Sequence, residues 1–318
     1  MSVIINAITP IFLLIALGMA IKIILNLKCT HFPILAKTCK MHNDSWSEIL
    51  NKYVLYIALP ALLFFSLTHT SIAELPSLFI IFINIALLTL IIGVSFFITK
   101  KLKLKKDIAN AYIFGIFFGN VAYIGLPFIL SLLPNTAGEL SILIAIHVII
   151  AFTLGLFILE YSKNKHANLA KIIKSIATNP LIIAITLGIL FLITGIKIPH
   201  QIDMAIQMLS SSASPIVLIA IGLFIAQKID IDKYFWHGTL IALIKIIVMP
   251  TIFLIVAILL QQTNSFNISI LEAAMPVALT TFALSEIYPI NKKIIANAII
   301  VSTATSVVTL TAFSFFVI

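Results

Sequence analysis

The sequence predicts an all-α polytopic membrane protein with ten transmembrane helices, arranged as two inverted five-helix repeats. Three observations support this fold class: ten long apolar runs, lysines that alternate between successive loops, and prolines that recur in the same order in both halves. Hydrophobic residues make up 61% and charged residues only 10% of the 318 positions, whereas a soluble domain carries about 25% charged residues. Ten spans of about 20 residues each fill most of this length.

Charged or turn residues bound the apolar runs and so place each predicted helix. Solid apolar runs favour helices over a membrane barrel, because barrel strands alternate between apolar and polar residues. The first run lacks the charged start and the cleavage site of a secretory signal, so we expect it to stay as the first helix. The predicted helices are 3–25, 50–70, 76–99, 108–133, 139–160, 178–196, 204–226, 235–260, 268–288 and 294–317.

Lysine placement predicts how these helices are oriented. All 20 basic residues are lysine, and eighteen of them lie in or next to the odd-numbered loops. The other two are Lys197, in an even-numbered loop, and Lys245, inside the eighth helix. Because short cytoplasmic loops carry an excess of positive charge, both termini are expected outside the cell membrane. Lysines beside the membrane also explain the net charge of +9, so no nucleic-acid partner is expected.

Prolines and glycines recur at matching places in the two halves. Pro10 precedes Gly18 by eight residues in the first helix, and Pro180 precedes Gly188 by eight in the sixth. The further matching pairs are Pro60 with Pro215 and Pro127 with Pro276. An odd number of spans per repeat forces the halves into opposite orientations, as in many secondary transporters. The predicted repeats are 1–160, with a cytoplasmic loop at 26–49, and 161–318.

The fourth and ninth helices carry the residues expected to bind a substrate. Each contains a proline, which removes a backbone hydrogen bond and frees polar groups that must face protein or a wet cavity. Matching broken helices indicate a binding site near the midplane, where a half-helix N-terminus attracts an anion; close helix packing is the alternative reason for such residues. The candidate substrate-binding residues are Asn120, Tyr123, Gly125, Pro127, Pro276, Thr280 and Thr281.

Three ionisable residues inside predicted spans, Lys245, His147 and Glu272, are candidates for charge or proton coupling. A lysine at mid-membrane costs roughly 2.5–3.5 kcal/mol, so Lys245 is expected to face an anionic substrate, pair with a carboxylate or reach toward the headgroups. His147 could relay protons or stay neutral in a hydrogen bond between helices. Hydroxyl residues of the tenth helix, beginning with Ser302, are expected to bond between helices or to their own carbonyls.

The first cytoplasmic loop contains two cysteines and two histidines. These residues are Cys29, His31, Cys39 and His42. They could in principle close around zinc, but their spacing fits no standard zinc finger. We therefore predict a polar loop with reduced thiols and no metal or cofactor, and a metal site stays open as the alternative. The chain has no arginine, so no bidentate guanidinium is available to hold an anion.

Three stretches carry a family resemblance. They are LNKYVLYIALPALLFF, GNVAYIGLPF and MPVALTTFALSEIYPINKKIIANAIIVSTATSVVTL. They resemble the auxin efflux carrier family, whose bacterial members are described as malate or malonate permeases. The resemblance implies that the fourth and ninth helices cross at their prolines, with an organic anion bound beside the crossover and Asn120 as the polar residue ahead of it. Plant members have polar residues where this chain has Met275 and Val277, which points away from an indole substrate.

These observations predict a secondary transporter that moves a small organic anion, a mono- or dicarboxylate such as malate or malonate, by alternating access. A sodium- or proton-coupled symporter or antiporter of similar fold is the alternative, although the fourth helix has no acidic residue for a cation site. An intramembrane enzyme is less favoured, because HExxH, GxSxG and phosphate-cradling motifs are absent from the sequence. Substrate, direction and coupling ion stay open, as does the oligomeric state, for which a homodimer is one arrangement.

Overall fold

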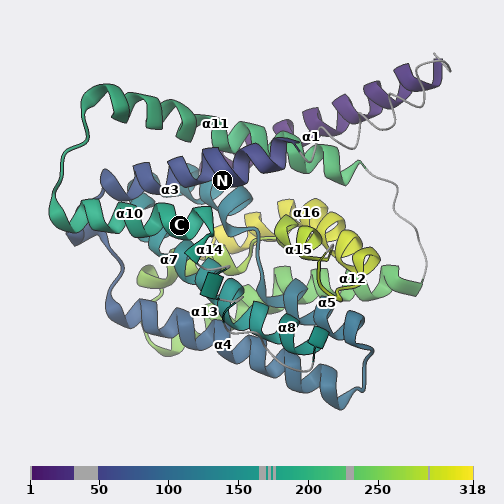
Figure 1. Cartoon of the computed structure of the whole chain (residues 1–318). Helices are drawn as coiled ribbons and strands as arrows, with labels where there is room; N and C mark the ends of the chain where they lie inside the picture. The colour runs from purple at the N-terminus through teal and green to yellow at the C-terminus, as the bar shows by residue number, and fades with distance from the viewer. Residues whose placement is uncertain are drawn as a thin grey trace.

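A computed structural model of the chain describes residues 2–31, 49–164, 170, 173–174, 177–226, 233–285 and 287–317. These residues form an all-helical molecule (Figure 1). No sheet occurs among them, and one isolated antiparallel backbone bridge joins Gly119 to Val277. The all-α fold class predicted from the sequence is therefore confirmed for the described part of the chain.

The described helices follow one another along the chain in this order. In the first half they are α1 (Ser2–His31), η1 (Val54–Ala58), α3 (Leu59–Thr68), η2 (Ile72–Glu74), α4 (Leu78–Lys101), α5 (Lys106–Phe117), η3 (Val121–Gly125), α6 (Leu126–Leu132), η4 (Pro134–Thr136), α7 (Ala137–Ile150), η5 (Ala151–Gly155) and α8 (Leu156–Asn164). In the second half they are α10 (Pro180–Thr194), α11 (His200–Ile225), α12 (Lys233–Leu243), η6 (Ile244–Val248), α13 (Met249–Leu259), η7 (Asn264–Phe266), α14 (Asn267–Ala273), α15 (Leu279–Leu284) and α16 (Lys292–Ser314).

Seven helical stretches of the described residues are long and apolar enough to cross a membrane. They are Ile4–Ile24, Ile49–Thr68, Leu78–Lys101, Pro134–Ser162, His200–Ile225, Tyr234–Leu259 and Lys292–Ser314. The other three predicted spans take shorter forms: 178–196 forms a helix of 15 residues, and 108–133 and 268–288 are each interrupted. The chain is thus a multi-pass membrane protein with seven candidate spans and additional short apolar helices.

Large apolar side chains cover the outside of these helices. Phe82 and Phe97 of α4 are 66% and 70% exposed, and Leu13 of α1 is 63% exposed. Such a surface is unfavourable in water, whereas lipid tails are as apolar as the side chains themselves.

Capping follows ordinary rules where helices begin in polar segments. Asn179, for example, accepts hydrogen bonds from the amides of Leu181 (2.9 Å) and Ile182 (3.3 Å) at the start of α10.

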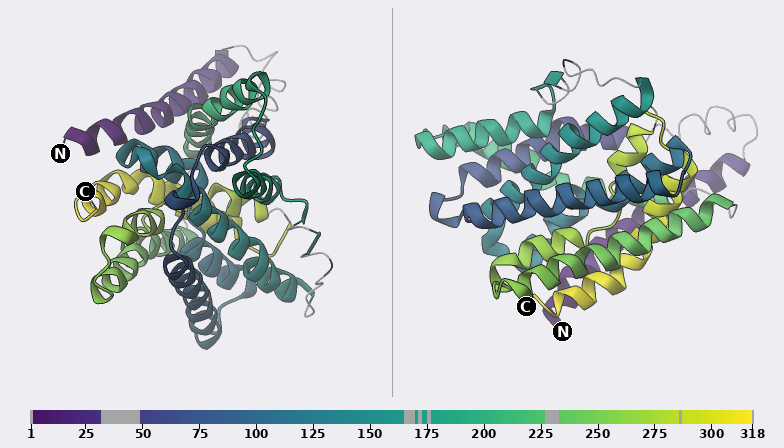
Figure 2. Two further views of the ribbon diagram at one scale, coloured as in Figure 1. Left: turned by 90° about the vertical axis from the view of Figure 1, so that its left-hand side faces the viewer. Right: turned by 90° about the horizontal axis from the view of Figure 1, so that it is seen from below.

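Two groups of helices pack side by side. The helices α1, α3 with its preceding turn η1, α10 and α11 contact mainly one another, and we call them the panel. The helices from α4 to α8 and from α12 to α16 form the second group, the bundle. The panel lies along the upper side of the molecule in Figure 1, and the left view of Figure 2 shows the two groups from a second direction.

Glycines allow close approach within the panel. A Cβ atom added to Gly18 of α1 would lie 3.0 Å from the Cα of Gly222 in α11 and would overlap the carbonyl oxygen of Ile219. A Cβ added to Gly188 of α10 would lie 2.9 Å from the Cβ of Leu67 in α3. Larger side chains at these positions would push the paired helices apart.

Three helices widen by one residue per turn shortly before a proline. The π-helical segments η1, η3 and η6 each end two residues before a proline, at Pro60, Pro127 and Pro250. Proline has no N–H, and its ring crowds the carbonyl four residues earlier, so a wider turn relieves the clash without breaking the helix. The sequence predicted that proline breaks the fourth and ninth helices, and it did not predict the widened turns before Pro60 and Pro250. Residues of all three segments lie close to the crossover described next.

Candidate functional site at a helix crossover

The first interrupted helix breaks between α5 and η3. The helix α5 ends at Phe117, and Phe118 is extended, with φ −86° and ψ 95°. Asn120 has φ −78° and ψ 51°, and the helix then resumes at Val121. Pro127 lies in the first turn of α6, seven residues beyond Asn120, where its missing N–H is tolerated.

The second interrupted helix breaks between α14 and α15. The helix α14 ends at Ala273, and α15 begins only at Leu279. Pro276 lies in the gap, and Ala278 is extended, with φ −67° and ψ 131°. The two predicted spans 108–133 and 268–288 are thus both broken near their prolines.

The two breaks lie against each other as a short antiparallel pair. The amide of Asn120 donates to the carbonyl oxygen of Pro276 at 2.7 Å, and the amide of Ala278 donates to the carbonyl oxygen of Phe118 at 2.9 Å. The amide of Val277 donates to the hydroxyl of Ser302 in α16 at 3.1 Å. Backbone groups that proline frees inside a membrane must find such partners, because lipid offers none.

A small cavity lies beside this crossover, between the panel and the bundle. Its volume is about 30 Å³, which holds about two water molecules. The residues that line it are Leu55, Phe118, Gly119, Asn120, Val121, Ala122, Tyr123, Val148, Phe152, Leu181, Ala278 and Thr280. Leu55 of η1 and Leu181 of α10 contribute the panel side, and the bundle contributes the rest. Any solute larger than water therefore needs these walls to move apart.

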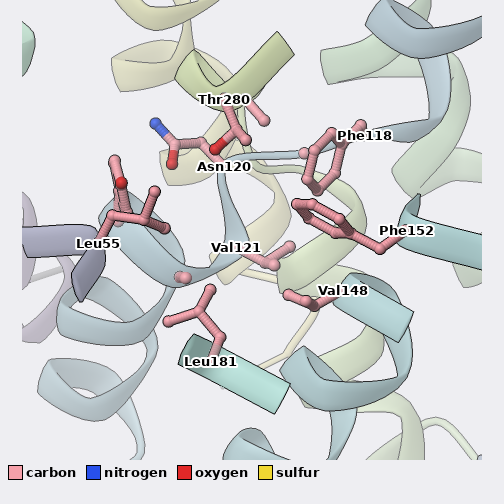
Figure 3. Close-up of a pocket in the computed structure, with 12 residues that line it drawn as sticks. Leu55, Phe118, Asn120, Val121, Val148, Phe152, Leu181 and Thr280 are labelled. Atoms are coloured by element: carbon pink, nitrogen blue, oxygen red, sulfur yellow. The ribbon is translucent and has the colours of Figure 1, made fainter. Parts of the chain in front are cut away.

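Polar side chains gather at one end of this cavity. Figure 3 shows Asn120 and Thr280 next to each other there, with Leu181 and Val148 toward the other end. No described residue hydrogen-bonds to the side chain of either Asn120 or Thr280, so both are available to a ligand. The first amides of the helix that begins at Val121 also belong to the wall, and such amides have no partner within their own helix.

The predicted substrate-binding residues divide into two sets. Asn120, Tyr123 and Thr280 line the cavity, whereas the other four do not. A Cβ on Gly125 would lie 3.1 Å from Cγ of Met275, so this glycine permits close packing at the crossover. Pro276 contributes its carbonyl to the backbone pair. Thr281 is fully buried, and its hydroxyl has no hydrogen-bond partner among the described residues. Pro127 lies in the first turn of α6, two residues after the widened turn of the first broken helix.

Lys245, His147 and Glu272 lie on the opposite face of the crossover. Lys245 is fully buried in η6, and its Nζ donates to the carbonyl oxygen of Ala273 at 2.8 Å. Nε2 of His147 lies 3.1 Å from the carbonyl oxygen of Phe117. This bond to a backbone carbonyl was not among the arrangements expected for Lys245, and the buried carboxyl group of Glu272 is close enough to interact with it electrostatically. A second cavity of about 10 Å³ lies here, lined by Asn84, Leu88, His147, Met249, Phe253, Ser269, Glu272 and Ala273.

Several wall residues were not predicted from the sequence. Leu55, Val148, Phe152 and Leu181 are apolar residues in apolar helices, and nothing in their local sequence sets them apart. The signal that could have found Leu55 is the proline five residues later, because the widened turn before Pro60 contains it. Ser302 was expected to bond between helices or to its own helix, and it does both, since its hydroxyl also lies 3.2 Å from the carbonyl oxygen of Ile299.

The cysteine and histidine set of the first loop falls largely beyond the described part of the chain. Cys39 and His42 lie outside the described residues, and for Cys29 and His31 only the backbone of α1 is described. In the part that the structure describes, no three His, Cys, Asp or Glu residues are grouped to hold a metal ion. For this loop, both the polar loop and the metal site therefore stay predictions.

Comparison with known proteins identifies the family. Residues 34–314 match the family described as membrane transport protein. The chain is 26% identical to "Uncharacterized transporter MJ1031" of Methanocaldococcus jannaschii, over 83% of this chain and 87% of that protein. It is 24% identical to "Putative malonate transporter" of Rhizobium meliloti, over 82% of this chain and 84% of that protein. It is also 24% identical to "Uncharacterized transporter YfdV" of Escherichia coli, over 84% of this chain and 87% of that protein. The family match confirms the resemblance seen in the sequence: this chain belongs to the membrane transport protein, or auxin efflux carrier, family.

Proposed function

We propose that this chain is a secondary transporter whose ten transmembrane helices form two inverted five-helix repeats, 1–160 and 161–318, with both termini outside the cell membrane. It carries a small organic anion, a mono- or dicarboxylate such as malate or malonate, by alternating access. The observation that carries the proposal is the pair of broken helices that meet at Asn120 and Pro276 beside a partly polar cavity. Family membership supports transport, and one relative is named for malonate.

Packing within the panel supports the inverted repeats. Gly18 of α1 contacts α11, and Gly188 of α10 contacts α3. In the proposed scheme the first helix packs on the seventh and the sixth packs on the second, which is the exchange that a two-fold axis between inverted halves produces. The start of α1 and the end of α16 lie at the same end of the molecule (Figure 2), as an even number of spans requires.

The carboxylate of the substrate is recognised without a cationic clamp. The chain has no arginine, and Lys245 does not line the cavity. The side-chain amide of Asn120 and the hydroxyls of Tyr123 and Thr280 supply the donors, together with the first amides of the helix that starts at Val121. Gly125, Pro127, Pro276 and Thr281 form the crossover that holds these donors in place.

Alternating access follows from the position of the cavity between two groups of helices. The cavity of about 30 Å³ is too small for malate or malonate, which have several times the volume of a water molecule. The proposed transport cycle moves the bundle against the panel, so that the walls around Leu55 and Leu181 separate first toward one side of the membrane and then toward the other. The crossover travels with the bundle because its hydrogen-bonding partners all belong to the bundle.

Charge or proton coupling is assigned to Lys245, His147 and Glu272. All three are buried behind the crossover, and one carboxylate oxygen of Glu272 has no hydrogen-bond partner among the described residues. In this assignment Lys245 supplies a fixed charge, and a protonation change at His147 or Glu272 would alter the net charge inside the bundle without contact to the substrate. A sodium- or proton-coupled symporter or antiporter of similar fold is the alternative, and uptake driven by an imposed sodium or proton gradient separates these cases.

The experiment that tests the proposal is transport in reconstituted vesicles. Labelled malate, malonate and other mono- and dicarboxylates are offered to wild-type protein, to Asn120→Ala, and to Asn135→Ala as a control at an exposed asparagine of η4. We expect at least one organic anion to move across the membrane, Asn120→Ala to reduce its transport at least tenfold, and Asn135→Ala to leave it unchanged.

Each outcome has a separate meaning. Transport that survives Asn120→Ala at the wild-type rate would contradict the site, and transport of no organic anion would contradict the substrate class. Hydrolysis or group transfer by the protein in detergent, with no vesicle present, would favour an intramembrane enzyme instead.

A further inference from the structure

The carbonyl ends of both interrupted helices face basic side chains. The last carbonyls of a helix have no amide partner and carry partial negative charge. At the broken helices of transporters such ends help to coordinate a sodium ion or a proton. In this chain the end of α5 meets His147 through the carbonyl of Phe117, and the end of α14 meets Lys245 through the carbonyl of Ala273.

The Lys245 ammonium lies between the two breaks. Its Nζ and Cε would each be 3.0 Å from a Cβ added to Gly119, which belongs to the first break. The same Nζ donates at 2.8 Å to the carbonyl of Ala273, which precedes the second break. The carbonyl oxygen of Glu272 would be 3.5 Å from that added Cβ, so backbone oxygen and ammonium share this small volume.

The surroundings of the ammonium are those of a cation site. The Glu272 side chain is 4% exposed and interacts electrostatically with Lys245, and its Oε1 has no hydrogen-bond partner in the described part of the chain. The side-chain amide of Asn84 donates to the hydroxyl of Ser269 at 2.9 Å, and both residues line the second cavity together with Glu272 and Ala273. Carbonyl, carboxylate, amide and hydroxyl oxygens are the groups that bind hard monovalent and divalent cations in proteins.

We propose that the Lys245 ammonium is a tethered cation that permanently fills a monovalent-cation site at the crossover, so that the transporter works without a bound metal ion. The lysine comes from η6, and its side chain brings the charge into the gap between the two breaks. Gly119 has no side chain, which leaves room for the ammonium. The predicted consequence is specific: shortening this side chain creates a vacant site that accepts a free cation such as sodium or ethylammonium.

The first test measures cation binding and does not require that the protein transports an anion. Only the second test rests on the proposed function. Thermal unfolding of the full chain in detergent is followed for wild type, Lys245→Ala and Lys245→Met, with sodium chloride or ethylammonium chloride added. Choline chloride at equal concentration controls for ionic strength, and Lys197→Ala is a matched control at an exposed lysine.

We expect Lys245→Ala to unfold at a lower temperature than wild type and to recover in a saturable way with ethylammonium or sodium. The recovery is expected to be about 2 °C at a concentration tenfold above the dissociation constant. Wild type, Lys197→Ala and Lys245→Met, in which a thioether fills the space, are expected to respond no more than they do to choline. A Lys245→Ala protein that folds, but whose unfolding temperature rises with neither sodium nor ethylammonium beyond the effect of choline, would overturn the proposal.

The second test uses wild-type protein alone and therefore does not depend on the stability of a variant. Transport of the anion found above is measured with sodium replaced by choline on both sides of the vesicle. An unchanged rate supports the tethered cation. A wild-type rate that falls more than tenfold without sodium, or wild-type stabilisation by sodium over choline, would overturn it. If no organic anion is transported at all, the proposed function fails while the unfolding test still decides the tethered cation.

Discussion

The two faces of the crossover differ in whether their polar side chains have hydrogen-bond partners. On the cavity face, the side chains of Asn120 and Thr280 have no hydrogen-bond partner among the described residues, and part of the wall comes from the panel. On the charged face, Lys245 and His147 contact backbone carbonyls and are enclosed by the bundle. Free donors beside a movable wall suit a ligand that binds and leaves. Permanently bonded groups suit the part that must keep its shape while it moves.

The largest expected effect breaks the charge balance on the charged face. Glu272→Gln leaves the Lys245 ammonium without its nearby carboxylate, and removing one partner of a buried pair costs about 3–5 kcal/mol. Lys245→Met leaves the Glu272 carboxylate without its cation, at a similar cost. The double variant leaves neither charge alone and should recover most of the lost free energy of unfolding. Chemical unfolding in detergent measures all three variants. Additive losses in the double variant would show that the two charges do not depend on each other.

A smaller effect is expected at Gly119, which belongs to both faces. Ala at this position would press on Cε and Nζ of Lys245, and overpacking of this kind costs about 1–3 kcal/mol. The matched control is Gly93→Ala in α4, where an added Cβ meets nothing within 4 Å and helix propensity alone should add about 0.5–1 kcal/mol. Thermal unfolding compares them. If the two substitutions lower the unfolding temperature equally, the side chain of Lys245 can move aside without cost.

On the cavity face, Thr280→Val tests one donor without changing the volume of the side chain. Loss of one hydrogen bond worth about 1 kcal/mol should raise the KM for the transported anion roughly fivefold. The unfolding temperature should stay the same, because no described residue bonds to this hydroxyl. Concentration-dependent uptake into vesicles gives the KM. A lowered unfolding temperature with an unchanged KM would place Thr280 among the structural residues instead.

The smallest effect is expected next door, at Thr281. Its hydroxyl is fully buried and has no partner among the residues described, so Thr281→Val removes an unsatisfied polar group. The change should be neutral or stabilising, by up to about 1 kcal/mol, and transport should be unaffected. Unfolding and uptake measured on the same preparation check both parts. A transport defect here with normal unfolding would mean that the helix turns during the cycle and exposes this residue.

The sequence predicted which two helices are broken because each contains a proline, although only Pro276 lies within its break and Pro127 follows the other break by seven residues. Pro127 and Pro276 lack a backbone donor whatever surrounds them, so a distortion nearby follows from the residue itself. Asn120, a polar residue beside such a break in an apolar helix, could be singled out for the same reason. The matching glycines Gly18 and Gly188 could be read as a repeat, since their spacing from a proline is identical in both halves.

The roles of Thr280, Thr281 and Lys245 could not be predicted, because they depend on tertiary packing. Thr280 and Thr281 are neighbours, and which one lines the cavity depends on the rotation of α15, a helix of only six residues. For Lys245 the sequence left three arrangements open, and the carbonyl that it contacts belongs to a residue far along the chain. The walls at Leu55 and Leu181 come from the panel, which no local pattern reveals.

The hydrogen bonds between the two breaks also bear on how the protein is made. Phe118 and Asn120 receive their backbone partners from Pro276 and Ala278, which lie near the other end of the chain. During synthesis the first break therefore enters the membrane before its partners exist, and it must wait with unpaired groups or bind water until the second repeat arrives. Assembly of the crossover is thus expected to be a late and slow step, governed by contacts between distant parts of the chain.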